Sequence, residues 1–158
     1  MEIKKCCFTG HRTLADRNAL KPRVANTLIN LIENRGVTDF YAGGAMGFDI
    51  MCEGAVLWLR EKYPFIRLHL VLPCPPEIQT SKWNGENKAR YNEILGKADS
   101  VTVLSDFYYN GCMRVRNERL VESADICVCC LDPLSPSSGT AQTVRLAQKK
   151  GIEIINLF

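Results

Sequence analysis

Residues 39–50 read Asp-Phe-Tyr-Ala-Gly-Gly-Ala-Met-Gly-Phe-Asp-Ile, and this stretch decides the class of fold. Residues 39–42 are predicted to form a β-strand, and residues 48–62 a helix that is apolar nearly all round. The glycines between them, at positions 43, 44 and 47, indicate a turn that joins the strand directly to the helix. The segment is therefore a strand–turn–helix unit.

The same alternation continues on both sides of this unit. Strands are predicted at residues 4–8, 39–42, 66–72, 100–104, 126–131 and 152–157, and helices at residues 23–35, 48–62, 88–97, 112–123 and 140–150. The runs at 100–104 and 126–131 are almost continuously apolar, which is typical of strands covered by helices on both faces. The pattern predicts an α/β fold: residues 1–158 as a single Rossmann-like three-layer domain with about six mostly parallel strands, helices on both faces and the strand order 3-2-1-4-5-6.

The composition is that of a soluble globular protein. Of 158 residues, 46% are hydrophobic and 23% charged, and the net charge of +3 is too small to indicate a nucleic-acid or membrane partner. No apolar run reaches the length of a membrane span, and the first residues lack the apolar stretch of a signal peptide. The eight cysteines fall largely in strand-like runs, where neighbours such as Cys6 and Cys7 face opposite sides of a sheet. We therefore expect free, buried thiols and a cytoplasmic location.

Polar and glycine-rich residues follow the predicted strands. Ligands of open parallel sheets bind beyond the carboxyl ends of the strands, so these residues form the candidate site. The loop with Gly43, Gly44 and Gly47 suits the close approach of a phosphate to a helix N-terminus. It equally suits a tight turn with Asp49 as a helix cap. The spacing matches neither the dinucleotide-binding nor the P-loop pattern.

A second loop of this kind, Ser137-Ser138-Gly139-Thr140, precedes the last helix. Alone it is more simply read as a helix cap, but two such loops at one edge favour an anionic ligand. Arg12, Arg114 and Arg116 are candidates to clamp a phosphate, or are solvated surface residues.

Aromatic and imidazole side chains offer further candidates. His11 is read as an acid or base, a ligand contact or a histidine hydrogen-bonded to backbone, the last two being favoured because no acid partner is visible. Trp83 either stacks on a ring of the ligand or anchors the long loop at residues 73–87. His69 lies within a predicted strand and is interpreted as structural. No cluster of metal ligands or hydrolase motif is recognised, so no metal and no cofactor are predicted.

Several stretches resemble the YpsA-like family of unknown function in the SLOG superfamily. They are Thr9-Gly10-His11-Arg12, the loop from Gly43 to Gly47, residues 83–99, Arg116-Asn117 and Ser123-Ala124-Asp125. Relatives of that family include the Lonely Guy phosphoribohydrolases and the Rossmann-like domain of the DNA-processing protein DprA (Smf). The resemblance covers essentially the whole chain. It implies a Rossmann-like fold and a nucleotide-derived ligand at the edge already identified.

The Lonely Guy enzymes use an arginine in an M-x-x-R-K motif and a glutamate in G-G-x-G-T-x-x-E. Residues 113–117 are similar to the first motif, with Asn117 in place of lysine, and residues 138–143 to the second, with Thr143 in place of glutamate. Threonine carries no negative charge to stabilise an oxocarbenium-like centre. Glu118 and Asp49 are other carboxylates that could act there.

The candidate ligand-binding residues are Thr9, Gly10, His11, Arg12, Gly43, Gly44, Gly47, Asp49, Trp83, Arg114, Arg116, Asn117, Ser137, Ser138, Gly139 and Thr140, and no catalytic residue is assigned. The leading hypothesis is binding, as in a sensor, of a nucleotide or a related phosphorylated small molecule. Whether the chain is an enzyme stays open, with nucleotide N-glycosidase as the alternative. A DprA-like single-stranded DNA module is a weaker one, because no basic stripe with interleaved aromatics is present. The oligomeric state is also open, a homo-oligomer included.

Overall fold

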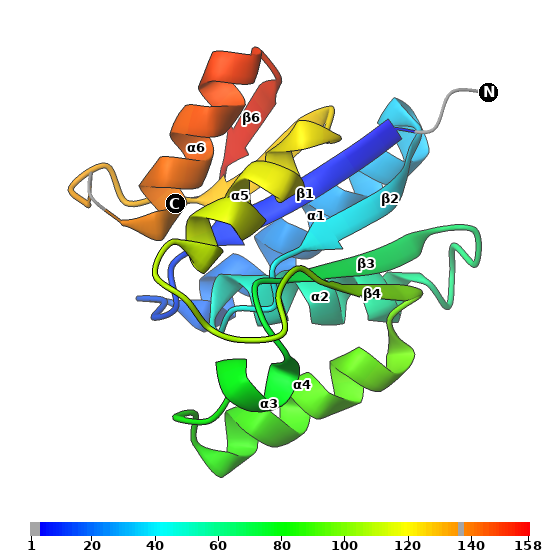
Figure 1. The fold of residues 1–158 in the computed structure, drawn as a ribbon. Helices are drawn as coiled ribbons and strands as arrows, with labels where there is room; N and C mark the ends of the chain where they lie inside the picture. The colour runs from blue at the N-terminus through cyan, green and yellow to red at the C-terminus, as the bar shows by residue number, and fades with distance from the viewer. Residues whose placement is uncertain (1–3, 136–137) are drawn as a thin grey trace.

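A six-stranded, all-parallel sheet forms the centre of the molecule (Figure 1). The computed structural model describes residues 4–135 and 138–158. Its strands are β1 (Lys4–Gly10), β2 (Val37–Ala42), β3 (Arg67–Leu72), β4 (Ser100–Val103), β5 (Ile126–Cys130) and β6 (Glu153–Asn156). They lie in the order β4-β3-β2-β1-β5-β6, which confirms the predicted fold class.

Helices cover both faces of this sheet. They are α1 (Arg17–Arg35), α2 (Phe48–Leu59), α3 (Pro76–Gln79), α4 (Gly85–Lys97), α5 (Cys112–Glu122) and α6 (Gly139–Lys150). Figure 1 shows α1 and α2 behind the sheet and α5 and α6 in front of it, while α4 contacts α2. Within the described ranges, no helix combines the length and the apolar character that crossing a bilayer requires.

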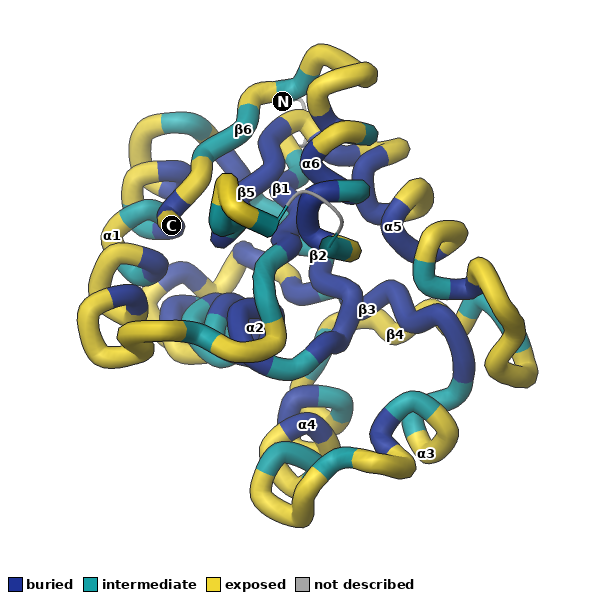
Figure 2. Tube along the Cα trace, turned by 90° about the vertical axis from the view of Figure 1, so that its left-hand side faces the viewer, coloured by how far each residue is buried: buried dark blue, intermediate teal, exposed yellow. Residues whose placement is uncertain are grey.

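The predicted strand order 3-2-1-4-5-6 is wrong for β4. This strand pairs with β3 at one edge of the sheet, and β5, not β4, pairs with β1. The expectation that helices cover both faces of β4 is also wrong: all four of its residues are exposed, Val101 and Val103 by 40% and 42% (Figure 2). Local hydropathy identifies a strand but not its place in the sheet, and α4 packs on α2 instead of covering β4.

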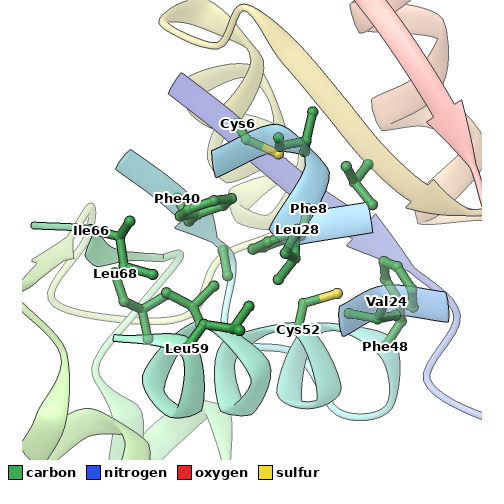
Figure 3. Packing of buried hydrophobic residues seen from close by; sticks show 14 of the residues in the cluster. Cys6, Phe8, Val24, Leu28, Phe40, Phe48, Cys52, Leu59, Ile66 and Leu68 are labelled. Carbon is green, nitrogen blue, oxygen red and sulfur yellow. The ribbon is translucent and has the colours of Figure 1, made fainter. Parts of the chain in front are cut away.

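The sheet separates two hydrophobic clusters, one on each face. The larger lies under α1 and α2 and contains Phe8 and Phe40, whose rings stack with centroids 5.8 Å apart (Figure 3). Cys6 belongs to this cluster and Cys7 to the smaller one under α5 and α6. All eight cysteines are free and buried. The prediction that neighbouring cysteines act as small apolar side chains on opposite faces is confirmed.

Two helices begin earlier than the hydrophobic pattern predicts. α1 begins at Arg17 instead of residue 23, because the Asp16 side chain accepts a hydrogen bond from the backbone N–H of Ala19 at 3.0 Å and caps the helix. Pro22 lies inside this helix, near its start. α4 begins at Gly85, after Asn84 caps it in the same way. The long loop before α4 contains the short helix α3.

Candidate functional site

A cavity of about 410 Å³ opens at the carboxyl ends of β1 and β5. The chain leaves β1 toward β2 on one side, and β5 lies on the other, so the cavity is at the point where the strand order reverses. Ligands of doubly wound sheets bind at such points. The cavity is lined by Thr9, Gly10, His11, Arg12, Ala45, Asp49, Met113, Arg116, Asn117, Ser138, Gly139 and Thr140. The structure thus brings together predicted residues from four separate segments.

The first turn of α6 forms one wall of the cavity. Ser138 caps this helix, its Oγ accepting a hydrogen bond from the backbone N–H of Ala141 at 3.1 Å. Gly139 is exposed, and a Cβ added to it would meet no atom within 4 Å. The cap and the cavity wall are therefore the same turn, with room for a ligand atom beside Gly139. The predicted residue Ser137 lies outside the described residues.

The glycine-rich loop between β2 and α2 lies behind the cavity. Gly43, Gly44 and Gly47 are not among the lining residues, whereas Ala45 is. Gly44 has a φ of +72°, and a Cβ there would collide with the hydroxyl of Tyr91 and a methyl group of Leu72. The loop serves the site by placing Asp49, whose Oδ2 accepts a hydrogen bond from the Ala45 N–H at 3.2 Å.

Arg116 crosses from α5 to this loop at the bottom of the cavity. It is 6% exposed; its Nη1 donates to the carbonyl oxygen of Gly43 at 2.5 Å and its Nε to Oδ1 of Asn117 at 2.9 Å. The Nδ2 group of Asn117 donates in turn to Gln142 on α6 at 3.1 Å. Burial lowers the pKa of Arg116, and nearby Asp49 opposes that shift. The guanidinium is thus held in place from three elements.

Two carboxyl groups of α2 lie buried beside this guanidinium. Burial raises the pKa of Asp49 to about 6, although Arg116 and the backbone N–H groups of Ala45 and Gly43 lower it. Glu53, one turn further along α2, is fully buried, and its pKa is raised well above the usual value by burial and by Asp49. Among the described residues, neither oxygen of Glu53 has a hydrogen-bond partner. The cavity is therefore lined by one carboxyl group with a raised pKa, that of Asp49, and Glu53 lies next to Asp49 without lining the cavity.

His11 lines the cavity but is tied to the backbone. Its Nε2 accepts a hydrogen bond from the N–H of Asp132 at 2.8 Å, which places the ring proton on Nδ1. That bond occupies the lone pair that a base would need on Nε2. The hydrogen bond of His11 to backbone agrees with one of the predicted alternatives, and its contact with a ligand stays a prediction because the residue also lines the cavity. Arg12 follows it and lines the cavity as well.

Three residues considered in the sequence analysis lie away from the cavity. Trp83 packs against Tyr91, with ring centroids 5.2 Å apart, and borders the larger hydrophobic cluster, so it anchors its loop. Arg114 is on the exposed side of α5, where its Nε lies 3.1 Å from Glu118. Thr143 is buried and donates to the carbonyl oxygen of Gly139 at 3.1 Å within its own helix. None of the three is among the lining residues.

Sequence reasoning missed Ala45 and Met113, which also line the cavity. Their side chains carry no polar group, so only their positions, within the glycine loop and at the start of α5, could have indicated them. In residues 4–135 and 138–158, no three His, Cys, Asp or Glu side chains are grouped as metal ligands. The groups available to a ligand are those described above.

Comparisons with known proteins agree with this architecture. A family model described as the YspA SLOG family (YpsA) matches residues 8–157. A UPF0398 protein of Halalkalibacterium halodurans is 29% identical over 121 residues, covering 75% of this chain and 62% of that protein. One of Staphylococcus saprophyticus is 33% identical over 92 residues, covering 58% and 47%. The matches thus span about half to three fifths of these relatives. The solved structure of DNA processing protein A from Helicobacter pylori, described as binding single-stranded DNA, superposes with a TM-score of 0.67 at 22% identity, covering 97% of this chain and 64% of that one.

Proposed function

Because the chain belongs to the YspA SLOG family, we propose that the cavity at the ends of β1 and β5 binds a nucleotide or a nucleotide-derived phosphorylated small molecule. The observation that carries this proposal is the meeting of the α6 N-terminus with Arg12 and Arg116 in one cavity. Backbone N–H groups at a helix N-terminus and arginine side chains both favour a phosphate. A volume of about 410 Å³ is in the range of small-ligand pockets.

The test is a thermal-shift panel of nucleotides, the corresponding nucleosides and inorganic phosphate. A ligand that binds only the folded state raises the melting temperature in proportion to its affinity. We expect nucleotides to stabilise the protein more than nucleosides do. Equal shifts from nucleosides and nucleotides would contradict a phosphate-directed site.

A matched pair of variants connects the result to this cavity. Arg12→Gln removes a charge from the lining, whereas Arg114→Gln removes one from the exposed side of α5. We expect the first to reduce nucleotide affinity by about tenfold or more, the loss of one charge-assisted hydrogen bond, and the second to leave it unchanged. Equal losses in both variants would indicate non-specific attraction by positive charge.

A second candidate function is hydrolysis of the N-glycosidic bond of a nucleotide, and the position of Asp49 favours it. Thr143 is at the position that resembles the glutamate of the Lonely Guy motif, and Glu118 pairs with Arg114 outside the cavity. Asp49 supplies a carboxyl group inside the cavity, with a pKa of about 6. In its ionised form it would stabilise positive charge on the sugar. Release of free base from a panel of nucleoside monophosphates, abolished by Asp49→Asn, would support catalysis. Intact nucleotides after prolonged incubation would show that the cavity binds nucleotides without hydrolysing them.

Binding of single-stranded DNA is the weaker alternative. The likeness to DNA processing protein A concerns the fold, and the net charge of this chain is only +3. A DNA-binding function would give an affinity that falls steeply with salt concentration, because phosphate contacts release counterions. We expect weak binding without a steep salt dependence.

We also expect the protein to act in a reducing compartment, the cytoplasm. All eight of its cysteines are free and buried, and an oxidising compartment would favour disulfides instead. Counting free thiols in protein purified without added reductant would test this. Fewer than the full number would contradict it.

A further inference from the structure

A chain of hydrogen bonds crosses three adjacent strands, away from the cavity described above. His69 on β3 lies between Asp39 on β2 and Ser100 on β4. Its Nε2 is 2.7 Å from Oδ2 of Asp39, and its Nδ1 is 2.6 Å from Oγ of Ser100. The strand register places His69 directly opposite Ser100, so the sheet itself fixes this arrangement.

The partners of His69 determine which ring nitrogen carries the proton. An ionised carboxylate can only accept a hydrogen bond, so Nε2 of His69 donates to Asp39. In the neutral ring, Nδ1 is then the acceptor, and the hydroxyl of Ser100 donates to it. A serine whose proton is held by a histidine, itself oriented by a carboxylate, has the arrangement of an activated nucleophile.

The three hydrogen-bonded side chains differ in exposure to solvent as a nucleophile and its base require. The side chains of His69 and Asp39 are 16% and 14% exposed, so their hydrogen bond is largely shielded from water. Ser100 is exposed at the start of the edge strand β4. The base and the group that orients it are therefore protected, and the hydroxyl is accessible.

A second cavity, of about 550 Å³, lies beside this chain of hydrogen bonds. Its floor is formed by Tyr41, Val71 and Thr102, and its wall by Arg119, Glu122 and Ser123 of the end of α5. The Tyr41 ring stacks on the His69 ring with centroids 4.6 Å apart. Thr102 is two residues beyond Ser100 and so shares its face of the strand. A small group attached to Ser100 would have this cavity next to it.

From this arrangement we infer that Ser100 is a nucleophile for acyl transfer, with His69 as its general base, Asp39 as the residue that positions His69, and a small activated carboxylic ester as the class of substrate. The edge position of β4 contributes as well. An edge strand carries backbone N–H groups that no neighbouring strand uses. Such donors can stabilise the negative charge that develops on a carbonyl oxygen under attack.

The reaction is complete without a further reactant except water. Ser100 Oγ forms a bond to the carbonyl carbon as its proton passes to Nδ1 of His69, and a tetrahedral oxyanion results. The oxyanion collapses, the bond to the alcohol oxygen breaks, and the proton on Nδ1 goes to the departing alcohol. Water then attacks the acyl-serine, its proton passing through Nδ1 to Ser100, which releases the carboxylic acid and restores the hydroxyl.

The experiment is covalent labelling of the folded protein with p-nitrophenyl acetate and, separately, with a fluorophosphonate. Intact-mass measurement gives the labelling rate, and peptide mapping identifies the residue. Ser105 is the matched control, because its hydroxyl donates to the backbone oxygen of Phe107 at 2.8 Å instead of to a histidine. We expect labelling at Ser100 that is about a hundredfold faster than at Ser105, the usual range for general-base assistance.

Variants and pH then identify the contribution of each residue. Ser100→Ala should abolish the adduct and Ser105→Ala should leave it, while His69→Gln should slow labelling about a hundredfold. Asp39→Asn should slow it too and change its pH profile, an effect that a purely structural role would not produce. Labelling of Ser100 no faster than of Ser105 would overturn the inference even if a variant failed to fold.

Discussion

Arg116 on α5 donates a hydrogen bond to the carbonyl oxygen of Gly43, a residue 73 positions earlier in the chain, at 2.5 Å. This contact joins the helix that leads into β5 to the loop that follows β2, so it closes the floor of the cavity across the point where the strand order reverses. It also brings the positive charge of Arg116 to the buried carboxyl of Asp49. The shape and the charge of the cavity therefore depend on the same side chain.

The first prediction concerns Arg116. Arg116→Met should lower the stability of the unliganded protein by about 3 kcal/mol. The substitution removes the buried positive charge next to Asp49 and the hydrogen bonds to Gly43 and Asn117. For a chain of this size that loss of stability is a fall in melting temperature of roughly 6–12 °C. Arg114→Met, on the exposed side of the same helix, should change it little. Equal melting temperatures for wild type and Arg116→Met would show that the contact does not stabilise the fold.

The second prediction compares two glycines at the starts of helices. Gly139 follows the capping residue Ser138, and Gly85 follows the capping residue Asn84; a Cβ at either meets no atom within 4 Å. Gly139→Ala should weaken binding of the nucleotide that gives the largest thermal shift by about tenfold to a hundredfold, because the methyl group occupies the approach of a phosphate. Gly85→Ala should not. Unchanged affinity in both variants would remove Gly139 from the site.

The third prediction concerns Gly44. Its positive φ and the closeness of Tyr91 mean that Gly44→Ala should destabilise the unliganded protein by about 1 kcal/mol or more. Chemical denaturation measures this directly. An unchanged free energy of unfolding with weakened nucleotide binding would instead give Gly44 the ligand-approach role that the sequence allowed.

The fourth prediction follows from Asp49, whose pKa is about 6 in the fold against 3.8 for the free carboxyl. The folded state holds this proton more tightly than the unfolded state does, so the contribution of Asp49 to stability falls as pH rises from about 4 to about 6. The total change is about 3 kcal/mol. Asp49→Asn cannot ionise, so it should be more stable than wild type at pH 7 and should lose that advantage near pH 4. Parallel stability profiles for the two proteins would contradict the raised pKa.

Hydropathy and glycine positions predicted most helices and strands correctly. They did not predict where each strand lies in the sheet. The predicted strand–turn–helix units are correct because hydropathy patterns and turn glycines depend only on residues that are close together in the sequence. The position of β4 is not, because residues 100–104 are apolar whether they lie at the centre or the edge of the sheet. The start of α1 was missed because the apolar pattern marks only residues 23–35, while the Asp16 cap lies further back.

The residues of the candidate site also fall into those that the sequence predicts and those that it cannot assign. The residues directly after β1 and at the start of α6 meet in the cavity because parallel strands end at one side of the sheet. Trp83 could not be assigned from sequence, since a ring that stacks on a ligand and one that packs on Tyr91 have the same local pattern. Arg114 and Arg116 are two residues apart on a helix, and so they point in different directions.

The pairing of β1 with both β2 and β5 determines the order in which strands can join the sheet during synthesis. β2, β3 and β4 can add to one side of β1 as they emerge from the ribosome, but the other side pairs with β5, where Cys7 lies opposite Cys127. Until that segment is synthesised, the central strand of the finished sheet is an open edge, and the face that α5 and α6 will cover is bare. Such delayed closure slows folding and exposes an edge to other chains. The growing chain is therefore most vulnerable to aggregation before β5 has been made.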